Sequence, residues 1–396
     1  MSALEIGQVI AAVGAIGLAV LLLQPIASRL RLPDPLLFLG LGVVLAQWSR
    51  VTDAVTADVV QVVGTVALIV ILADGGLRCG ARTLRRVLAP VLTLGIGGTL
   101  ITFGVVAVLA HELTDLPWTY SLILGAVLAP TDPAAVFSAL AGETARIGRI
   151  GRVLEGEAGL NDPIAIALAA QFVNVAIHGA DASAVDVAGT MVREAVIGVG
   201  VGVLLALALT RVLGPLWPTV AAAPALAVLA GAGFAFGLAV VLHGSGFVAA
   251  YLYGLVAGDR TIPDRDGVIA LHSELAHLGE VAMFVLLGVA ITRVDLGSAL
   301  VDGALLALAI MVVIRPLLTF PTLRGFHYTR AEAAFGALAG LRGAVPILLA
   351  SLPLAAHLAH GGEILALTAV VVIASLVVQG IPLPRVADRL HLADAS

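Results

Sequence analysis

The sequence has few charged residues, and this scarcity decides its class. Only 12% of the 396 residues are charged, whereas 60% are hydrophobic, and the mean hydropathy is +1.09. Soluble domains carry about 25% charged residues, so the composition excludes an ordinary soluble protein. A membrane-spanning helix needs about 20 apolar residues, and most of the chain divides into runs of this kind. We therefore expect an integral membrane protein with little chain left for a soluble domain.

Cysteine and lysine are also scarce or missing. Cys79 is the single cysteine, so the chain cannot form an internal disulfide. All 21 basic residues are arginine, and no basic patch with interleaved aromatic residues suggests nucleic-acid binding. His357 and His360 have the spacing of a helix face but no third ligand nearby in sequence, so neither a resident metal nor a cofactor is expected.

Apolar runs and polar breaks predict an all-α polytopic membrane protein with about thirteen transmembrane helices. The first run has no basic region before it and no small-residue cleavage site after it, so we interpret it as a retained helix. We expect one membrane domain over residues 1–396, without a soluble C-terminal domain. The predicted helices span about 4–24, 35–49, 57–77, 87–110, 118–142, 152–177, 189–213, 219–241, 244–258, 268–291, 297–320, 331–356 and 362–383.

The arginines predict the orientation of these helices. Cytoplasmic loops of membrane proteins are enriched in Arg and Lys. If the N-terminus is outside, the inner loops contain most of the arginines, and the outer loops contain only Arg50, Arg193 and Arg293. We therefore expect a multi-pass protein of the cell membrane, with the N-terminus outside and the C-terminus in the cytoplasm.

Two of the predicted helices are interrupted in mid-span. Residues 130–133, PTDP, place two prolines three apart in the fifth helix, where they remove two backbone donors. Residues 340–346, GLRGAVP, interrupt the twelfth helix with two glycines and a proline. Each helix is the fourth of five, so helices 2–6 (35–177) and 9–13 (244–383) are interpreted as inverted repeats with two broken, crossing helices. Paired interruptions of this kind indicate a binding site near the bilayer midplane.

Asp132 and Asp162 lie in segments apolar enough to cross a bilayer, where an ionised carboxylate costs about 2.5–3.5 kcal/mol. Asp162 and Arg342 are each expected about 15 Å from the inner surface, at a depth close to that of Asp132. A buried carboxylate needs a positive partner or a proton. These residues are therefore expected to share one plane and to contribute to a polar site.

The sixth helix supplies further acids to this plane. Glu157 and Asn161 have i,i+4 spacing, so one face presents both of them towards Arg342 or Arg315, and the sequence does not choose between the two arginines. Asp162 lies about 100° round the helix from Asn161. We expect Asp162 to be the acid that titrates, so that a proton and a cation compete for its oxygens.

Five motifs are spread over most of the chain: LADGGLR (72–78), APTDPAAV (129–136), EGEAGLNDP (155–163), GSGFVAAYLYGLVAG (244–258) and GLRGAVP (340–346). Together they resemble those of the monovalent cation:proton antiporter superfamily, on its electroneutral NhaP-like branch of sodium/proton and potassium/proton exchangers. The resemblance implies thirteen helices, a homodimer, a core bundle that moves against a dimerisation bundle, and exchange of Na+ or K+ for H+.

The resemblance also implies a role for each site residue. Asp162 is the shared proton and cation carboxylate, Thr131 and Asp132 belong to the unwound-helix site, and Asp74 lies at the inner edge of the cavity. Glu157 and Arg342 form a structural ion pair.

Two neighbours of Asp162 bear on stoichiometry and coordination. Asn161 stands where electrogenic relatives have Asp, which implies one-for-one exchange. Ala158 stands where many relatives have Ser, so water, backbone or Asp74 is expected to complete the coordination of the cation.

Other interpretations of the same residues remain open. Asp162 can be a structural acid, Asp132 and Thr131 a polar cap of a half-helix, and Asp74 a boundary charge beside Arg78. A gated cation channel is the alternative function, although no filter-like run of carbonyls is present. A third hypothesis is an intramembrane hydrolase that uses two aspartates, for which no substrate-site signature is found. The choice between Na+ and K+ stays open, with potassium-type relatives slightly favoured.

Overall fold

The computed structural model describes residues 14–25, 32–140, 147–179, 184–213, 223–260, 262–390 and 392. Residues 4–13 of the first predicted helix lie outside this part of the chain. The described regular elements are all helices, without a strand. An all-helical fold is therefore confirmed.

Eight of the described helices are long and apolar enough to cross a membrane. They are α4 (Ala57–Cys79), the continuous α6, η1 and α7 (Leu88–Leu92, Thr93–Gly98 and Thr99–Leu113), α10 (Gly148–His178), α11 (Ala184–Leu213), α12 (Ala223–Val241), α14 with η4 (Arg265–Ala290 and Ile291–Arg293), the continuous α15, η5 and α16 (Leu296–Leu308, Ala309–Ile314 and Arg315–Gly325), and α19, η6 and α20 (Gly361–Ser375, Leu376–Gly380 and Leu383–Arg389).

Shorter helices make up the rest of the described chain. The apolar ones are Gly14–Pro25, α2 (Asp34–Leu45), α13 (Gly246–Gly258) and α18 (Ala344–Ala355). Together α8 (Trp118–Leu128) and α9 (Pro133–Ala139) are long and apolar enough to form one bent span, and the others are α3 (Ser49–Ala54), α5 (Ala81–Arg86) and α17 (Arg330–Leu338). A full span needs about 20 residues, so the multi-pass architecture is confirmed while the count of thirteen stays a prediction.

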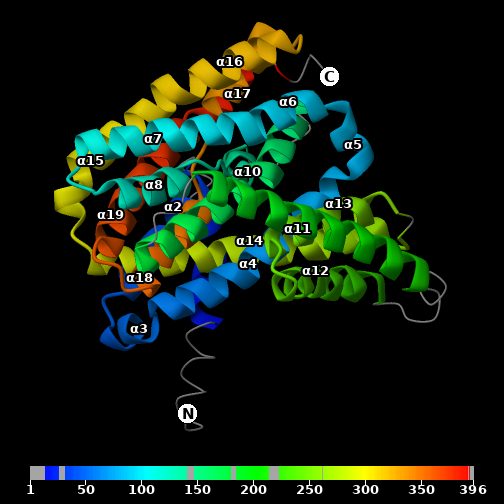
Figure 1. Ribbon diagram of the computed structural model, residues 1–396, viewed down its shortest axis with the longest axis horizontal. Helices are drawn as coiled ribbons and strands as arrows, with labels where there is room; N and C mark the ends of the chain where they lie inside the picture. Colours follow the sequence, from blue (N-terminus) through cyan, green and yellow to red (C-terminus); the bar gives the residue numbers. More distant parts are fainter. Residues whose placement is uncertain are drawn as a thin grey trace.

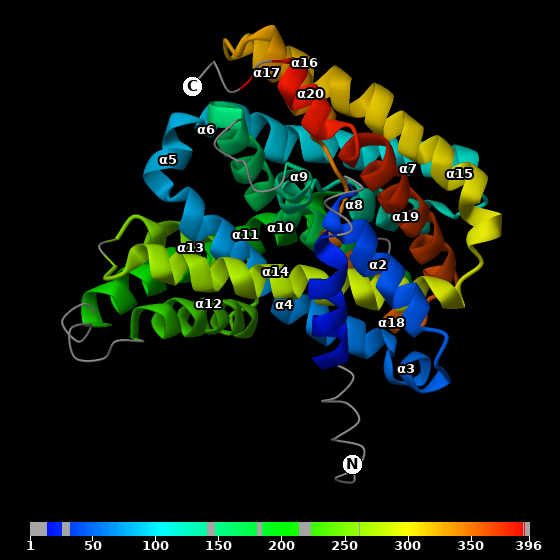
Figure 2. The ribbon, with the colours of Figure 1, turned by 180° about the vertical axis from the view of Figure 1, so that it is seen from behind.

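The helices form two bundles that lie side by side (Figures 1 and 2). In the first bundle, α13 and α14 pack against α4, α14 also packs against α2, and α11 and α12 cover α13. A buried apolar cluster extends over α4 and α11–α14 alone. The second bundle contains α7, α8, α10 and α15–α19. The two bundles meet where α10 and α18 contact α4.

The first predicted break separates α8 from α9. Residues 129–132 are not helical, and the two helices are bent by 44°. Pro133 occupies the first turn of α9, where its missing N–H costs nothing because no intrahelical partner exists there. The prolines therefore end one half-helix and begin the next, as the sequence predicts.

The second predicted break separates α17 from α18 over residues 339–343. The glycines of this segment permit close approach of neighbouring groups. A Cβ atom at Gly340 would lie 2.6 Å from Nε of Arg315, and a Cβ atom at Gly343 would collide with the carboxylate of Asp132. A side chain at either position would displace a charged group of the crossing, so glycine is required at both.

Candidate functional site

Asp132 joins the two broken helices at their N-terminal ends. Its Oδ1 accepts hydrogen bonds from the backbone N–H groups of Ala134 (2.8 Å) and Ala135 (3.2 Å) at the start of α9. Its Oδ2 accepts from the backbone N–H of Ala344 (3.1 Å) at the start of α18. The backbone N–H of Asp132 donates to the carbonyl of Leu341 (2.8 Å). One carboxylate thus caps two half-helices, and its negative charge faces the positive ends of both helix dipoles.

Arg342 donates hydrogen bonds to carbonyl groups at the C-terminal ends of the two broken helices' first halves, α8 and α17. Its Nε donates to the carbonyl of Leu128 at the end of α8 (3.0 Å), and a terminal nitrogen donates to the carbonyl of Gly340 just beyond α17 (3.1 Å). Its backbone N–H donates to Oγ of Ser375 (3.0 Å). The side chain is 1% exposed. Asp132 and Arg342 therefore satisfy the backbone groups that the two breaks set free.

The partner of Glu157 is Arg315, which corrects the pair implied by the resemblance. Arg315 donates from both terminal nitrogens to the two carboxylate oxygens of Glu157, at 2.9 Å in one of these bonds. Both side chains are buried. Arg342, the partner implied by the resemblance, is occupied by the carbonyls of the two breaks. Of the two arginines that the sequence left open, Arg315, at the junction of η5 and α16, is the one that neutralises Glu157.

Asp162 has no such partner among the described residues. The residue is 5% exposed, and its Oδ1 has no hydrogen-bond partner among the described residues. Its neighbour Asn161 is held in place because its side-chain N–H donates to Oγ1 of Thr131 (2.8 Å). This bond connects α10 to the segment between α8 and α9, and so fixes the helix that carries Asp162 against the crossing.

Asp74 lies on α4 and is 1% exposed. Its Oδ1 accepts a hydrogen bond from Oγ of Ser273 on α14 (2.9 Å), and its Oδ2 lies 3.0 Å from a terminal nitrogen of Arg78. The partial exposure of Arg78, at 35%, indicates that this end of the site approaches the surface. Asp74 is thus a neutralised acid at the edge of the site and not an isolated boundary charge.

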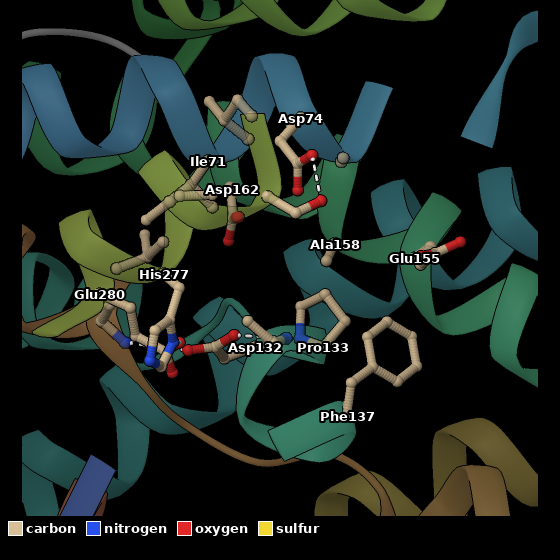
Figure 3. A pocket seen from close by; sticks show the side chains of 18 of the residues that line it. Ile71, Asp74, Asp132, Pro133, Phe137, Glu155, Ala158, Asp162, His277 and Glu280 are labelled. Carbon is tan, nitrogen blue, oxygen red and sulfur yellow. Dashed lines mark hydrogen bonds and ion pairs between the residues drawn. The ribbon is translucent and has the colours of Figure 1, made fainter. Parts of the chain in front are cut away.

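A cavity of about 400 Å³ brings these acids together. It lies between the two bundles, because α4, α13 and α14 line one wall and α9, α10 and α18 line the other. In Figure 3, Asp162 lies between Asp74 on one side and Asp132 on the other. Ala158, Gly159 and Glu155 continue the wall along α10. Thr131, Asn161, Glu157 and the two buried arginines stand behind this wall and are not among its lining residues.

Sequence reasoning missed Glu280 as a cavity residue. It lies on α14, is 6% exposed, and its Oε1 has no hydrogen-bond partner among the described residues. Its other oxygen lies 3.6 Å from Nδ1 of His277. The available signal was an acid in the middle of a predicted helix, since such acids are functional by default.

Two polar side chains from the first bundle were also missed. Tyr251 on α13 and Ser273 on α14 both line the cavity. Neither has a sequence signal that separates it from an ordinary core residue, because only the packing of α13 and α14 against α4 brings them to the site.

The chemistry of the cavity is that of oxygen ligands. Carboxylate, hydroxyl and carbonyl oxygens suit hard cations, whereas thiolate and imidazole suit transition metals. Among the described residues no group of three histidines, cysteines or acids is placed to hold a metal ion. His360 contacts Glu363 at 2.8 Å, and this pair likewise has no third ligand in the described chain. Asp132 accepts three backbone hydrogen bonds, which leaves it poorly suited to the acid–base work of a hydrolase.

The relatives found by comparison with known proteins carry similar names. The family described as "Sodium/hydrogen exchanger, transmembrane" matches residues 16–389. A protein of Shewanella oneidensis named K(+)/H(+) antiporter NhaP2 is 34% identical over 385 residues, which cover 95% of this chain and 66% of that protein. A protein of Alkalimonas amylolytica named K(+)/H(+) antiporter NhaP is 33% identical over 400 residues, which cover 98% and 67%. The chain thus spans about two thirds of the length of these relatives.

Archaeal proteins are similar in sequence and in fold. Na(+)/H(+) antiporter 1 of Methanocaldococcus jannaschii is 27% identical over 367 residues, which cover 87% of this chain and 83% of that protein. The solved structure of the sodium proton antiporter MjNhaP1 from this organism at pH 8 has a TM-score of 0.75 at 25% identity, and the match covers 94% of this chain and 99% of that one. The overall fold of this chain therefore has a solved counterpart.

Proposed function

Because the chain belongs to the sodium/hydrogen exchanger family, on its NhaP-like branch, we propose that it is a secondary antiporter that exchanges a monovalent cation for a proton across the cell membrane. The relatives are named antiporters, and none of those compared above is named a channel. The gated-channel alternative therefore has no support from them.

The observation that carries the proposal is the state of Asp162. Glu157 is neutralised by Arg315, Asp74 by Arg78, and the charge of Asp132 by the N-terminal ends of two half-helices. Asp162 faces the same cavity with an unpartnered oxygen and has no ion-pair partner among the described residues, whereas the second oxygen of Glu280 lies 3.6 Å from Nδ1 of His277. A buried carboxylate requires either a proton or a cation, so the site alternates between the two bound species.

The remaining residues support this exchange. Thr131 and Asn161 hold α10 against the crossing, Asp132 caps the half-helices beside the cavity, and Asp74 lines the cavity next to Arg78. The position of the cavity between two bundles fits alternating access, in which one bundle moves against the other around the site.

Four finer features belong to the proposal. Asn161 carries no charge, and one cation for one proton gives electroneutral exchange. We place the N-terminus outside and the C-terminus in the cytoplasm on the basis of the arginines. The protein acts as a homodimer, as the family resemblance implies. We propose K+ as the preferred cation, because the relatives named for K+ match at 33–34% identity and the one named for Na+ at 27%.

The test is proton flux in liposomes that contain the purified protein and a trapped pH-sensitive dye. An imposed cation gradient should drive proton movement in the wild type, and Asp162→Asn should abolish it because the amide binds neither proton nor cation with the required charge. Flux with K+, Na+ and Li+ in turn should give the lowest KM for K+.

The matched control is Glu363→Gln, which removes an acid that is 40% exposed and is not among the residues that line the cavity. This variant should transport at the wild-type rate. Proton flux that does not depend on the cation, or full activity in Asp162→Asn, would overturn the proposal.

A further inference from the structure

The wall of the cavity next to Asp162 has an apolar residue where a cation needs an oxygen. Ala158 lies four residues before Asp162 on α10, so the two share a helix face, and both line the cavity. A methyl group donates nothing to a cation. Some other oxygen near this point of the wall must therefore contribute if Asp162 is to hold a dehydrated ion.

The hydroxyl of Tyr251 is an unsatisfied oxygen at this point. Tyr251 is 2% exposed, and its hydroxyl is buried without a hydrogen-bond partner in the described part of the chain. Leaving a buried polar group unpaired costs about 1–3 kcal/mol, so such groups call for an explanation. Tyr251 also lines the cavity, which gives its hydroxyl access to a ligand there.

Gly159 on α10 shows where the hydroxyl of Tyr251 lies. A Cβ atom built at Gly159 would collide with Cζ, Cε2 and the hydroxyl oxygen of Tyr251. The phenol therefore lies directly against the backbone of α10, beside Ala158 and three residues before Asp162. Residues three and four apart are neighbours on a helix surface, so the hydroxyl lies about one helical turn from the site of Asp162.

We propose that the hydroxyl oxygen of Tyr251 binds the transported cation together with Asp162, in the position that Ala158 leaves without an oxygen. The phenol oxygen has lone pairs that can face the cation. The lack of a side chain at Gly159 is what admits the ring. This inference rests on the proposed antiporter function.

The test compares Tyr251→Phe with wild type in the liposome assay. Loss of a ligand oxygen should raise the KM for the cation about tenfold, while the maximal rate stays within about twofold. Adding Ala158→Ser to Tyr251→Phe should restore the KM, because serine returns an oxygen to the same stretch of wall. A purely structural role of the tyrosine would not be rescued in this way.

Tyr253→Phe is the matched control. Tyr253 lies on the same helix and is equally buried, but its hydroxyl donates to the carbonyl of Ala227 on α12 (3.1 Å) and it is not a cavity residue. Its removal should leave the KM unchanged. If Tyr251→Phe fails to fold, Gly159→Ala, which forces the hydroxyl away from α10, should raise the KM in the same direction.

Unchanged KM in Tyr251→Phe, or a raised KM that Ala158→Ser does not restore, would overturn the inference while leaving the antiporter function intact. Absence of cation-dependent flux in the wild type would instead refute the proposed function itself. Cation-dependent shifts in the unfolding temperature of the purified variants give a second measure of affinity. The variants with a raised KM should show the smaller shifts.

Discussion

Arg315 and Arg342 are both buried beside the crossing, but they bind different groups. Arg315 holds the carboxylate of Glu157, whereas Arg342 holds the carbonyl oxygens of Leu128 and Gly340. Removing one partner of a buried ion pair leaves an uncompensated charge, which costs about 3–5 kcal/mol. Stability measurements can therefore show which arginine is the partner of Glu157.

A double-mutant cycle on Glu157 tests this assignment. Glu157→Gln and Arg315→Met should each lower the unfolding temperature of the detergent-solubilised protein, and the double variant should lose much less than the sum of the two, because neither charge is left alone. The same cycle with Arg342→Met should be closer to additive. A larger coupling of Glu157 to Arg342 than to Arg315 would contradict the structure.

The sequence predicted some of these residues well and others not at all. The acids at positions 132, 157 and 162 were found because carboxylates in apolar segments are conspicuous. The partner of Glu157 was not decided, since 158 residues separate it from Arg315 and only tertiary packing joins them. Tyr251 gave no signal, because tyrosine in an apolar helix is an ordinary core residue.

The broken helices are the elements that the sequence predicted most directly. Proline and glycine act locally on the backbone. The breaks at residues 130–133 and 340–346 can therefore be predicted from these segments alone. The capping pattern, in which Asp132 caps both α9 and α18, could not be predicted from the sequence. That pattern requires two segments more than 200 residues apart to cross.

Substitution of Asp132 tests its double capping role. Asparagine has one acceptor oxygen where aspartate has two, so Asp132→Asn should keep the cap of one half-helix and lose the cap of the other. Asp132→Ala should cost about 1–2 kcal/mol for each helix end that loses its cap. The unfolding temperature in detergent measures the difference, and equal losses in the two variants would rule out the capping role.

At the scale of the whole molecule, the two bundles touch on one side of the cavity. Gly64 on α4 packs against Leu348 on α18, and a Cβ atom at Gly64 would lie 3.7 Å from the Cβ of Leu348. Gly64 lies towards the end of α4 away from Arg78, which marks the side from which the cavity extends to the surface. This contact closes the opposite side, and the proposed alternating access requires it to open.

A disulfide across this contact should stop transport. The Cβ separation is within the 3.5–4.5 Å range of natural disulfides, so Gly64→Cys with Leu348→Cys, in a Cys79→Ser background, should cross-link on oxidation. Flux in liposomes should fall to the protein-free level and return on addition of dithiothreitol, whereas each single cysteine variant should be insensitive to oxidation. Full flux in the cross-linked protein would mean that the bundles need not separate at this contact.

The proposed exchange depends on one carboxylate that holds either a proton or a cation. Ligands must lose their protons to bind a metal ion, so cation binding at Asp162 should release about one proton per cation bound. The most direct measurement is calorimetric titration of the purified protein with K+ in buffers of different ionisation enthalpy, which counts the protons released. We predict about one proton for the wild type and none for Asp162→Asn. Cation binding without proton release in the wild type, or proton release that persists in Asp162→Asn, would contradict the claim.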